Sequence, residues 1–273
     1  ADDTIDGGGN TGATGVDTLT ATVNTLGTST AAAVLDIDNV ETVTLEATTA
    51  ASYIDLSGST GVTTINVGDA NAAAGVTLGL SNMASTTKIG LGGVAADNEF
   101  KGTLIVNLAD ETGSADNVEF VLAETDGDND VNATLQVGTG TTTITTGVEK
   151  VTITADDQNA TGAATLDVTK VASAELEIKG GATTTPQLLT LGTLNKATTT
   201  LDASTYTGTL SVTGSNSATT MTVKQGASAN AITLGTANDT LTLADLEDDD
   251  ADGGAGTGDT LNATIDGNET KDT

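Results

Sequence analysis

Segments rich in glycine and aspartate are the parts of this sequence whose residue types could do chemistry. The clearest of them reads Gly-Gly-Ala-Gly-Thr-Gly-Asp-Thr-Leu over residues 253–261. Glycine allows tight turns whose carbonyl oxygens stay exposed, and an aspartate that follows such a turn can complete a shell of oxygen ligands around Ca²⁺. Further carboxylates precede this segment at Asp239, Asp252 and 247–250. The C-terminal part therefore predicts a calcium-binding turn, with a flexible acidic linker as the alternative.

A looser relative of this turn lies near the other end of the chain. Asp6 is followed by three glycines, and Asp17-Thr18-Leu19 follows at a short distance. The same chemistry makes Asp6, Gly8 and Asp17 candidate metal ligands. Two related turns of this kind make a stronger signal than one, because glycine-rich turns are common.

A third candidate is the run Asp126-Gly127-Asp128-Asn129-Asp130. Its alternating carboxylates match the first ligands of an EF-hand loop. Val131 stands where the invariant glycine of that loop would be, and Val137 stands where its bidentate glutamate would be. The run is therefore not an EF-hand. We expect a simpler calcium site at Asp126, Asp128 and Asp130, with a solvated acidic turn as the alternative.

Composition excludes several classes of function. The 273 residues include 38 acidic and 8 basic side chains, which gives a net charge of −30, and His, Cys, Trp and Arg are absent. Without His or Cys there is no ordinary zinc site, no histidine base and no catalytic thiol. A strongly negative chain without Arg also excludes ordinary binding of nucleic acid, which depends on basic residues that contact the phosphates. Four aromatic residues cannot line the usual cleft of a glycosidase, and we expect no enzymatic activity; a β-helix enzyme acting on polysaccharide is the remote alternative.

The negative charge also bears on stability. Repulsion among 38 carboxylates opposes compaction, and low hydrophobicity with high charge favours disorder. Regular placement of Val, Leu, Ile and Ala argues instead for a folded, thin, aliphatic core. Because no cysteine is present to form disulfides, another stabilising link is required. Ca²⁺, which prefers oxygen ligands, is the expected cofactor.

Short runs that alternate apolar and polar residues recur along the whole chain and predict an all-β fold. Apolar positions 43, 54, 65 and 76 lie eleven residues apart, and so do 210, 221 and 232. Even spacing suits a solenoid or a sandwich. Aliphatic interiors and abundant Thr and Asn, which can form ladders on stacked strands, favour a repetitive parallel β-solenoid. Tandem β-sandwich domains are the alternative.

A longer repeat divides the chain. Asn-Val-Glu-Thr-Val-Thr-Leu at 39–45 corresponds to Gly-Val-Glu-Lys-Val-Thr-Ile at 147–153, and the Asp-Thr-Leu phrase at 17–19 returns at 239–241 and 259–261. This pattern predicts two β-rich repeats between two glycine- and aspartate-rich ends. The predicted segments are 1–38, 39–146, 147–235 and 236–273. We hypothesise that they form one period of a longer tandem array.

The phrases at 39–45, 54–67 and 252–261 resemble those of large secreted bacterial surface proteins, namely S-layer proteins and RTX adhesins exported by type I secretion. The last of them is similar to the RTX nonapeptide, with one residue inserted before its aspartate. The resemblance implies a calcium-dependent β-rich surface protein that folds outside the cell. It also implies that Gly254, Gly256 and Asp259 act as calcium ligands.

These observations lead to one expected function. We expect a structural protein on the outer surface of a bacterial cell, which self-assembles with copies of itself into a calcium-stabilised S-layer or related array. A surface polysaccharide is a further expected partner, whereas nucleic acid is not. No apolar run reaches the length of a transmembrane segment, so membrane insertion is not expected. The alternative is the extender region of an RTX adhesin, which would hold a binding tip away from the cell.

Overall fold

The computed structural model describes residues 4–8, 15–48, 51–69, 75–92, 100–122, 131–155, 163–181, 188–214, 219–226, 230–244 and 249–263. Every regular element in these ranges is a β-strand, and 23 strands are present. The described ranges accordingly hold no helix with the length and apolar character needed to cross a membrane. The all-β prediction is confirmed.

Two long parallel sheets contain nearly all of the strands. Sheet 1 has eleven strands in this order: β2 (Thr18–Val23), β5 (Thr42–Ala47), β7 (Thr64–Asp69), β9 (Lys88–Gly90), β11 (Asn117–Leu122), β13 (Lys150–Ala155), β15 (Glu175–Gly180), β17 (Thr200–Tyr206), β19 (Thr222–Lys224), β21 (Thr240–Leu243) and β23 (Thr260–Ala263).

Sheet 2 has ten strands, which run in this order from the N-terminal side: β3 (Ala33–Val34), β6 (Ser52–Asp55), β8 (Thr77–Met83), β10 (Thr103–Leu108), β12 (Asn132–Val137), β14 (Ala163–Val171), β16 (Leu188–Thr193), β18 (Thr209–Thr213), β20 (Ala231–Thr233) and β22 (Asp250–Asp252). A separate pair joins β1 (Thr4–Asp6) to β4 (Asp36–Asp38) at the N-terminal end.

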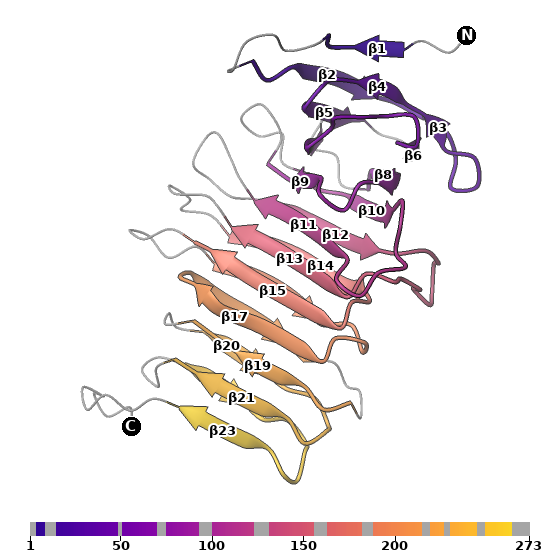
Figure 1. The fold of residues 1–273 in the computed structure, drawn as a ribbon. Helices are drawn as coiled ribbons and strands as arrows, with labels where there is room; N and C mark the ends of the chain where they lie inside the picture. Colours follow the sequence, from indigo (N-terminus) through magenta and orange to yellow (C-terminus); the bar gives the residue numbers. More distant parts are fainter. Residues whose placement is uncertain are drawn as a thin grey trace.

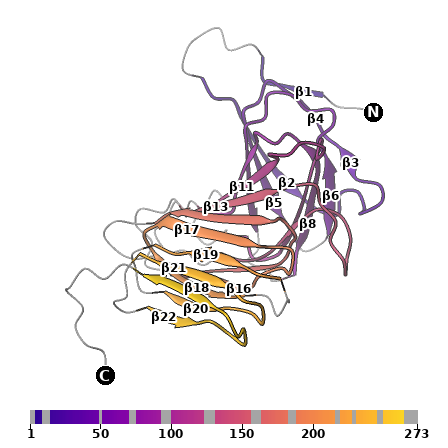
Figure 2. The same cartoon turned by 60° about the horizontal axis from the view of Figure 1, so that its bottom comes forward.

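The chain alternates between the two sheets, so each turn of the solenoid, which we call a rung, gives one strand to each. Thr42 of β5 pairs with Thr64 of β7, 22 residues later, and the spacing of eleven residues seen in the sequence is therefore half a rung. Other rungs range from 18 residues, at Thr222 and Thr240, to 34, at Gln136 and Lys170. In Figure 1 the rungs stack from β1 at one end to β23 at the other. Figure 2 separates β17, β19 and β21 from β18, β20 and β22 as two layers.

This architecture is a parallel β-solenoid, as predicted. All strand pairs within sheets 1 and 2 are parallel, whereas β-sandwich domains are built from antiparallel strands. The tandem sandwich alternative is therefore wrong. Strands also pair across the borders of the predicted segments, since β2 pairs with β5, β11 with β13, and β19 with β21. The four predicted segments therefore differ in sequence pattern, and strand pairing continues across their borders.

The repeat found in the sequence corresponds to equivalent places in the solenoid. The phrase at 39–45 leads into β5, and the phrase at 147–153 leads into β13, four strands later in sheet 1. Likewise 54–56 begins within β6 and 166–168 lies within β14, both in sheet 2. The sequence similarity thus reflects the same alternation of strands between the two sheets.

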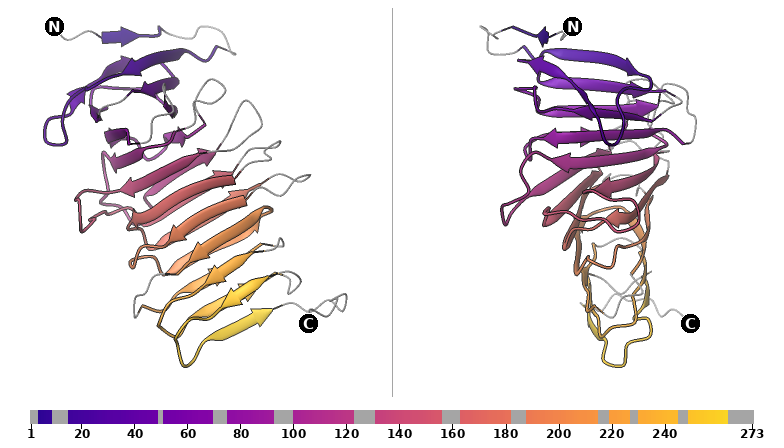
Figure 3. Two further views of the ribbon diagram at one scale, coloured as in Figure 1. Left: turned by 180° about the vertical axis from the view of Figure 1, so that it is seen from behind. Right: turned by 90° about the vertical axis from the view of Figure 1, so that its right-hand side faces the viewer.

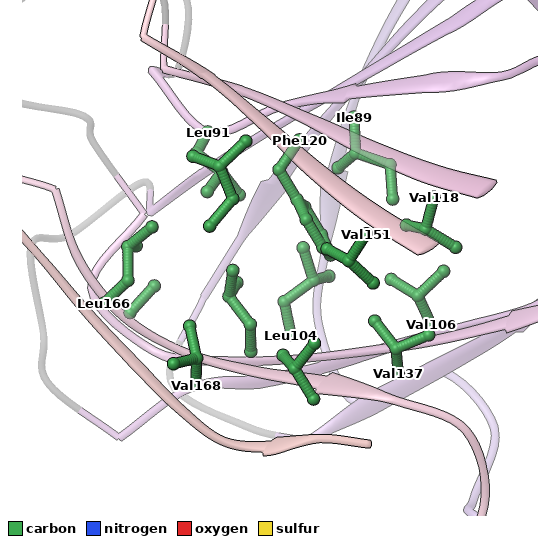
Figure 4. Close-up of a cluster of buried hydrophobic side chains, with 14 of the residues drawn as sticks. Ile89, Leu91, Leu104, Val106, Val118, Phe120, Val137, Val151, Leu166 and Val168 are labelled. Carbon is green, nitrogen blue, oxygen red and sulfur yellow. The ribbon is translucent and has the colours of Figure 1, made fainter. Parts of the chain in front are cut away.

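The core lies between the sheets and is mostly aliphatic. Strict alternation in β10 and β11 buries every second side chain, as expected for strands with one face in a core. Figure 4 shows Leu104 and Val106 from sheet 2 facing Val118 and Phe120 from sheet 1. Phe120, with Phe100 and Tyr206, is among the few aromatic side chains and is fully buried. This packing holds both sheets, and hence the turns between them, in a fixed relation.

Truncation of Phe120 tests the core. Phe120→Ala should lower the free energy of unfolding by about 3–5 kcal/mol, because it leaves a cavity in a packed interior. Val121 follows it on β11 and points to the opposite face, where it is only half-buried. Val121→Ala is therefore the matched control and should cost less than about 1.5 kcal/mol. Urea unfolding followed by circular dichroism compares the two, and equal losses would contradict the assignment of faces.

Candidate metal-binding turns and the carboxylate ladder

The C-terminal turn joins β22 to β23 and closes on its own aspartates. Asp252 Oδ1 accepts a hydrogen bond from the Gly254 amide at 2.9 Å, and Gly254 has a φ of +79°, which glycine adopts without strain. The Asp259 carboxylate folds back over the turn. A Cβ at Gly253 would lie 3.1 Å from Asp259 Oδ2, and a Cβ at Gly256 would overlap the carboxylate. These glycines are therefore required for the carboxylate to enter the turn.

The described part of the N-terminal turn, residues 4–8 and 15–17, has the same local contacts. Asp6 Oδ1 accepts a hydrogen bond from the Gly8 amide at 2.9 Å, and Gly8 also has a φ of +79°. A Cβ at Gly7 would lie 3.1 Å from Asp17 Oδ2. Each value matches its counterpart in the C-terminal turn. The weaker sequence similarity at this end is therefore accompanied by matching contacts at Asp6, Gly8 and Asp17.

One oxygen of the Asp17 carboxylate lacks a hydrogen-bond donor among the described residues. This oxygen, Oδ2, is buried. A buried carboxylate oxygen of this kind is costly unless a donor or a cation compensates it. Asp17, at its glycine turn, thus suits an oxygen-binding cation such as Ca²⁺, and Asp259 holds the equivalent place at the other end.

The structure gathers the predicted ligands at the two ends of the solenoid. Asp6, Gly8 and Asp17 belong to the first turn, and Asp252, Gly254, Gly256 and Asp259 belong to the last. Asp239 lies one rung before the last turn, directly ahead of β21. Asp126, Asp128 and Asp130 lie outside the described residues. No group of three or more acidic side chains with the arrangement of a metal site occurs in the described ranges.

Asp239 has a structural role that the sequence did not reveal. It precedes β21, is only 2% exposed, and accepts hydrogen bonds from the amides of Met221 at 2.8 Å and Gly235 at 3.2 Å. The Asp239 amide in turn donates to Asp259 Oδ1 at 2.9 Å. Residues 221, 239 and 259 each precede a strand of sheet 1, on consecutive rungs. The carboxylate of each rung thus holds the backbone of the rung before it.

The same contact occurs elsewhere along sheet 1. Glu41 accepts a hydrogen bond from the Asp17 amide at 2.8 Å, and Glu149 accepts one from the Asp116 amide at 2.9 Å. We call this set of contacts the carboxylate ladder. Neither glutamate was a candidate site residue. The signal that could have identified them is the repeated Val-Glu phrase, which places a glutamate directly before a strand in both repeats.

Hydroxyl groups form a parallel set of links between rungs. Several Thr and Ser side chains donate to a carbonyl oxygen of the preceding rung, at distances from 2.7 to 3.2 Å. They are Thr48, Ser59, Thr63, Ser81, Thr87, Thr198, Thr199 and Thr207. The chain thus satisfies much of its rung-to-rung bonding with its own side chains. The Thr ladder expected on stacked strands is seen separately, in the register of sheet 1, where Thr200, Thr222, Thr240 and Thr260 lie beside one another on successive strands.

Other aspartates close turns at strand ends. Asp55 Oδ1 accepts hydrogen bonds from the side chain of Asn82 at 2.7 Å and from the amide of Ser57 at 2.8 Å. The Asn82 bond is the main reason that the pKa of Asp55 lies below its ordinary value, because such bonds favour the ionised carboxylate. The pKa of Asp6 is lowered in the same way by Asn39 and then by Gly8. These carboxylates are structural acceptors, and they remain charged at neutral pH.

Most of the lysines with a described partner lie on the outer face of sheet 1. Lys150 Nζ is 2.9 Å from Glu175 and 3.1 Å from Glu177, and the bond to Glu175 raises the pKa of the lysine. Lys224 Nζ is 2.8 Å from Asp202 Oδ2 across β17 and β19. These exposed pairs offset part of the negative charge, although each contributes little stability on its own.

Comparison with models of protein families, with curated proteins and with solved structures gave no match.

Removal of the Asp239 carboxylate tests the ladder. Asp239→Ala should lower the free energy of unfolding by about 2–5 kcal/mol, since each buried amide left without an acceptor costs about 1–3 kcal/mol. Asp239→Asn keeps one acceptor oxygen and should cost less. The matched control is Asp250→Ala, at an exposed position of β22, with an expected change within about 0.5 kcal/mol. Unfolding is measured in a chelator, so that cations play no part. A neutral Asp239→Ala change would contradict the ladder.

The acid dependence of the Asp202 contacts gives a second test. Burial raises the pKa of Asp202, but hydrogen bonds from Lys224 and Ser204 outweigh it, so the pKa lies below the ordinary 3.8. Stability from this group is therefore complete above pH 3.8 and is lost as the pH falls through the lower, folded value. Asp202→Asn should cost up to about 1 kcal/mol at pH 7.

The experiment compares the urea midpoints of the native chain and Asp202→Asn from pH 7 down to pH 2. Because the general repulsion among carboxylates is nearly the same in both proteins, the difference isolates Asp202. It should shrink toward zero below pH 3.8. A difference that stays constant over the whole range would show that the ionised carboxylate contributes nothing.

Proposed function

We propose that this chain is a structural, non-enzymatic protein of the bacterial cell surface, which assembles with copies of itself into a calcium-stabilised S-layer or related extracellular array. The observation that carries the proposal is the pairing of a continuous solenoid with closely similar glycine–aspartate turns at its two ends. Such turns make oxygen ligands available, and a stack of parallel rungs is a stiff building element.

Calcium would act by neutralising the ends. The chain carries a net charge of −30, and repulsion among its carboxylates disfavours both folding and association. Asp17 and Asp6 would hold a cation at the first turn, and Asp259 and Asp252 would hold one at the last. A bound Ca²⁺ supplies positive charge that converts repulsion between neighbouring carboxylates into attraction. One site filled at about 100 times its Kd adds roughly 2.7 kcal/mol to stability.

The roles of the described carboxylates support a structural rather than a catalytic function. Asp239, Glu41 and Glu149 accept backbone hydrogen bonds from a neighbouring rung, whereas catalytic acids and bases need an accessible proton. A polar hollow of the surface is not lined by Asp239, Glu41 or Glu149. This hollow of about 430 Å³, on the outer face of sheet 2, is lined mainly by Thr, Ser and Gly, with Tyr53, Asn107 and Gln136. Such a lining suits the expected polysaccharide partner.

The elongated stack also fits the alternative, an extender region of a secreted adhesin. Strands β1 and β23 lie at opposite ends of the solenoid in both views of Figure 3, which is the arrangement a spacer requires. Electron microscopy with Ca²⁺ distinguishes the two functions. Sheets or filaments that grow with protein concentration favour the array, whereas single rods of uniform length favour the extender.

Calcium removal tests the proposal directly. In EDTA the melting temperature should fall, and added CaCl₂ should restore it in a saturable way. Asp259→Asn keeps an acceptor for the Asp239 amide but removes a charged ligand, so its gain from CaCl₂ should be smaller. Asp250→Asn, on the same rung but outside the turn, is the control and should respond as the native chain does. An identical spectrum and melting point in EDTA and CaCl₂ would reject the proposed role of calcium.

A further inference from the structure

The two terminal strands of sheet 1 carry nearly the same sequence. Strand β2 follows Asp17 and begins Thr-Leu-Thr-Ala, and β23 follows Asp259 and reads Thr-Leu-Asn-Ala. Neither strand contains a charged residue or a proline, although the chain has 38 acidic residues. Proteins usually protect exposed sheet edges with charges, prolines or bulges. Within the described residues these two edges have no such protection, and they lie at opposite ends of the solenoid (Figure 1).

Apolar exposure is also concentrated at the ends. Leu261 of β23 is 58% exposed, whereas its register partners Leu241 and Val223 on the preceding strands are 4% and 1% exposed. Six large hydrophobic side chains are exposed among the described residues, and five of them belong to the terminal rungs. These five are Ile5, Val16, Leu26, Val34 and Leu261. The positions in register with Ile5 and Leu261 are buried on the interior rungs, at Ile37 and Leu241, because another rung lies on each side.

We propose that the C-terminal edge of one copy of this chain stacks on the N-terminal edge of a second copy, so that β23 and β2 pair in parallel and sheet 1 continues across the junction. This inference rests on the proposed self-assembly and names its contact surface. The partner is a second molecule of the same chain. Because the two surfaces differ, the contact is head to tail, and its repetition along the solenoid axis generates a filament.

The hydrogen-bond pattern within the chain fixes the register of this junction. On consecutive rungs, the first amide of a strand donates to the carbonyl of the residue before the previous strand, as Thr240 does to Met221 at 2.9 Å and Thr260 does to Asp239 at 2.8 Å. The next member of the series is the Thr18 amide of the second copy, donating to the Asp259 carbonyl. Leu19 then lies beside Leu261, and Thr20 lies beside Asn262.

The carboxylate ladder continues in the same register. Asp239 holds the Met221 amide, and Asp259 holds the Asp239 amide. Asp17 precedes β2 as Asp259 precedes β23, and it has the same relation to its glycine turn. In the stacked pair, the Asp17 carboxylate of the second copy therefore accepts a hydrogen bond from the Asp259 amide of the first copy.

The turns at the two ends would also stack on each other. Stacking would bring the acidic C-terminal turn of one copy close to the acidic N-terminal turn of the other, which brings like charges together. The chain already contains such a contact, because Asp6 is in register with Asp38 on the next rung. Repulsion at the junction predicts that stacking strengthens with Ca²⁺ or with salt, which screens exposed charges.

Cysteine pairing tests the register. The chain has no cysteine, so Thr20→Cys and Asn262→Cys introduce single thiols at exposed positions of β2 and β23. Adjacent parallel strands bring Cα atoms within the 4.4–6.8 Å that a disulfide requires. A mixture of the two single variants, oxidised in CaCl₂, should give mainly the mixed 20–262 dimer by mass spectrometry. The double variant should give a ladder of multimers.

The outcomes separate this inference from the proposed function. A predominant 20–20 dimer would overturn the head-to-tail contact. Assemblies seen by light scattering without any 20–262 link would also overturn it, while leaving the proposed self-assembly in place. A chain that stays monomeric at all protein and CaCl₂ concentrations would overturn both.

A second pair of variants tests the edge without cysteine. Thr42 bonds to the carbonyl of Asp17, so in a parallel ladder the amide of Thr18 points away from β5, to the open edge. Thr18→Pro removes that amide at the first residue of a strand, where proline is tolerated. It should abolish assembly while the circular dichroism spectrum stays unchanged. Thr18→Val keeps the amide and should assemble as the native chain does; assembly of Thr18→Pro at native strength would contradict the inference.

Discussion

The hydrogen bond from one rung to the next is the interaction on which the rest of this structure depends. A solenoid has no distant contacts that could compensate a weak neighbour, so each rung is held by the two beside it. Here the backbone ladders of two sheets are joined by side chains before the strands, from the carboxylate of Asp239 to the hydroxyl of Thr87. With an aliphatic core and no disulfide, these links make a thin and highly charged chain a rigid stack.

Much of the fold could be predicted from the sequence, because it follows from local patterns. Alternation in segments such as 103–108 gave the strands and their buried faces, and the spacing of eleven residues was half a rung. Spacing alone could not separate a solenoid from a sandwich, because both use short strands at even intervals. The direction of pairing decides between them, and it depends on contacts between residues about 22 apart, such as Thr42 and Thr64.

The candidate site divides in the same way. Glycine and aspartate at 252–259 predicted a tight turn that binds calcium. The structure has a turn there, over which the Asp259 carboxylate folds back, and calcium binding stays a prediction. Glu41 and Glu149 were missed, because a glutamate before a strand resembles any surface residue until the next rung supplies its donor. The many acidic residues are thus more than potential metal ligands. Part of the negative charge serves the folded chain directly, because these carboxylates accept hydrogen bonds from backbone amides.

Amide hydrogen exchange tests the central claim most directly. In the presence of a chelator, the amides of Met221 and Asp239 should exchange as slowly as those within the strands of sheet 1, because carboxylates of the next rung hold them. Exchange at the rate of an unstructured peptide, while the strand amides stay protected, would contradict the account. It would mean that the rungs are held by their backbone alone and that the carboxylates serve another purpose.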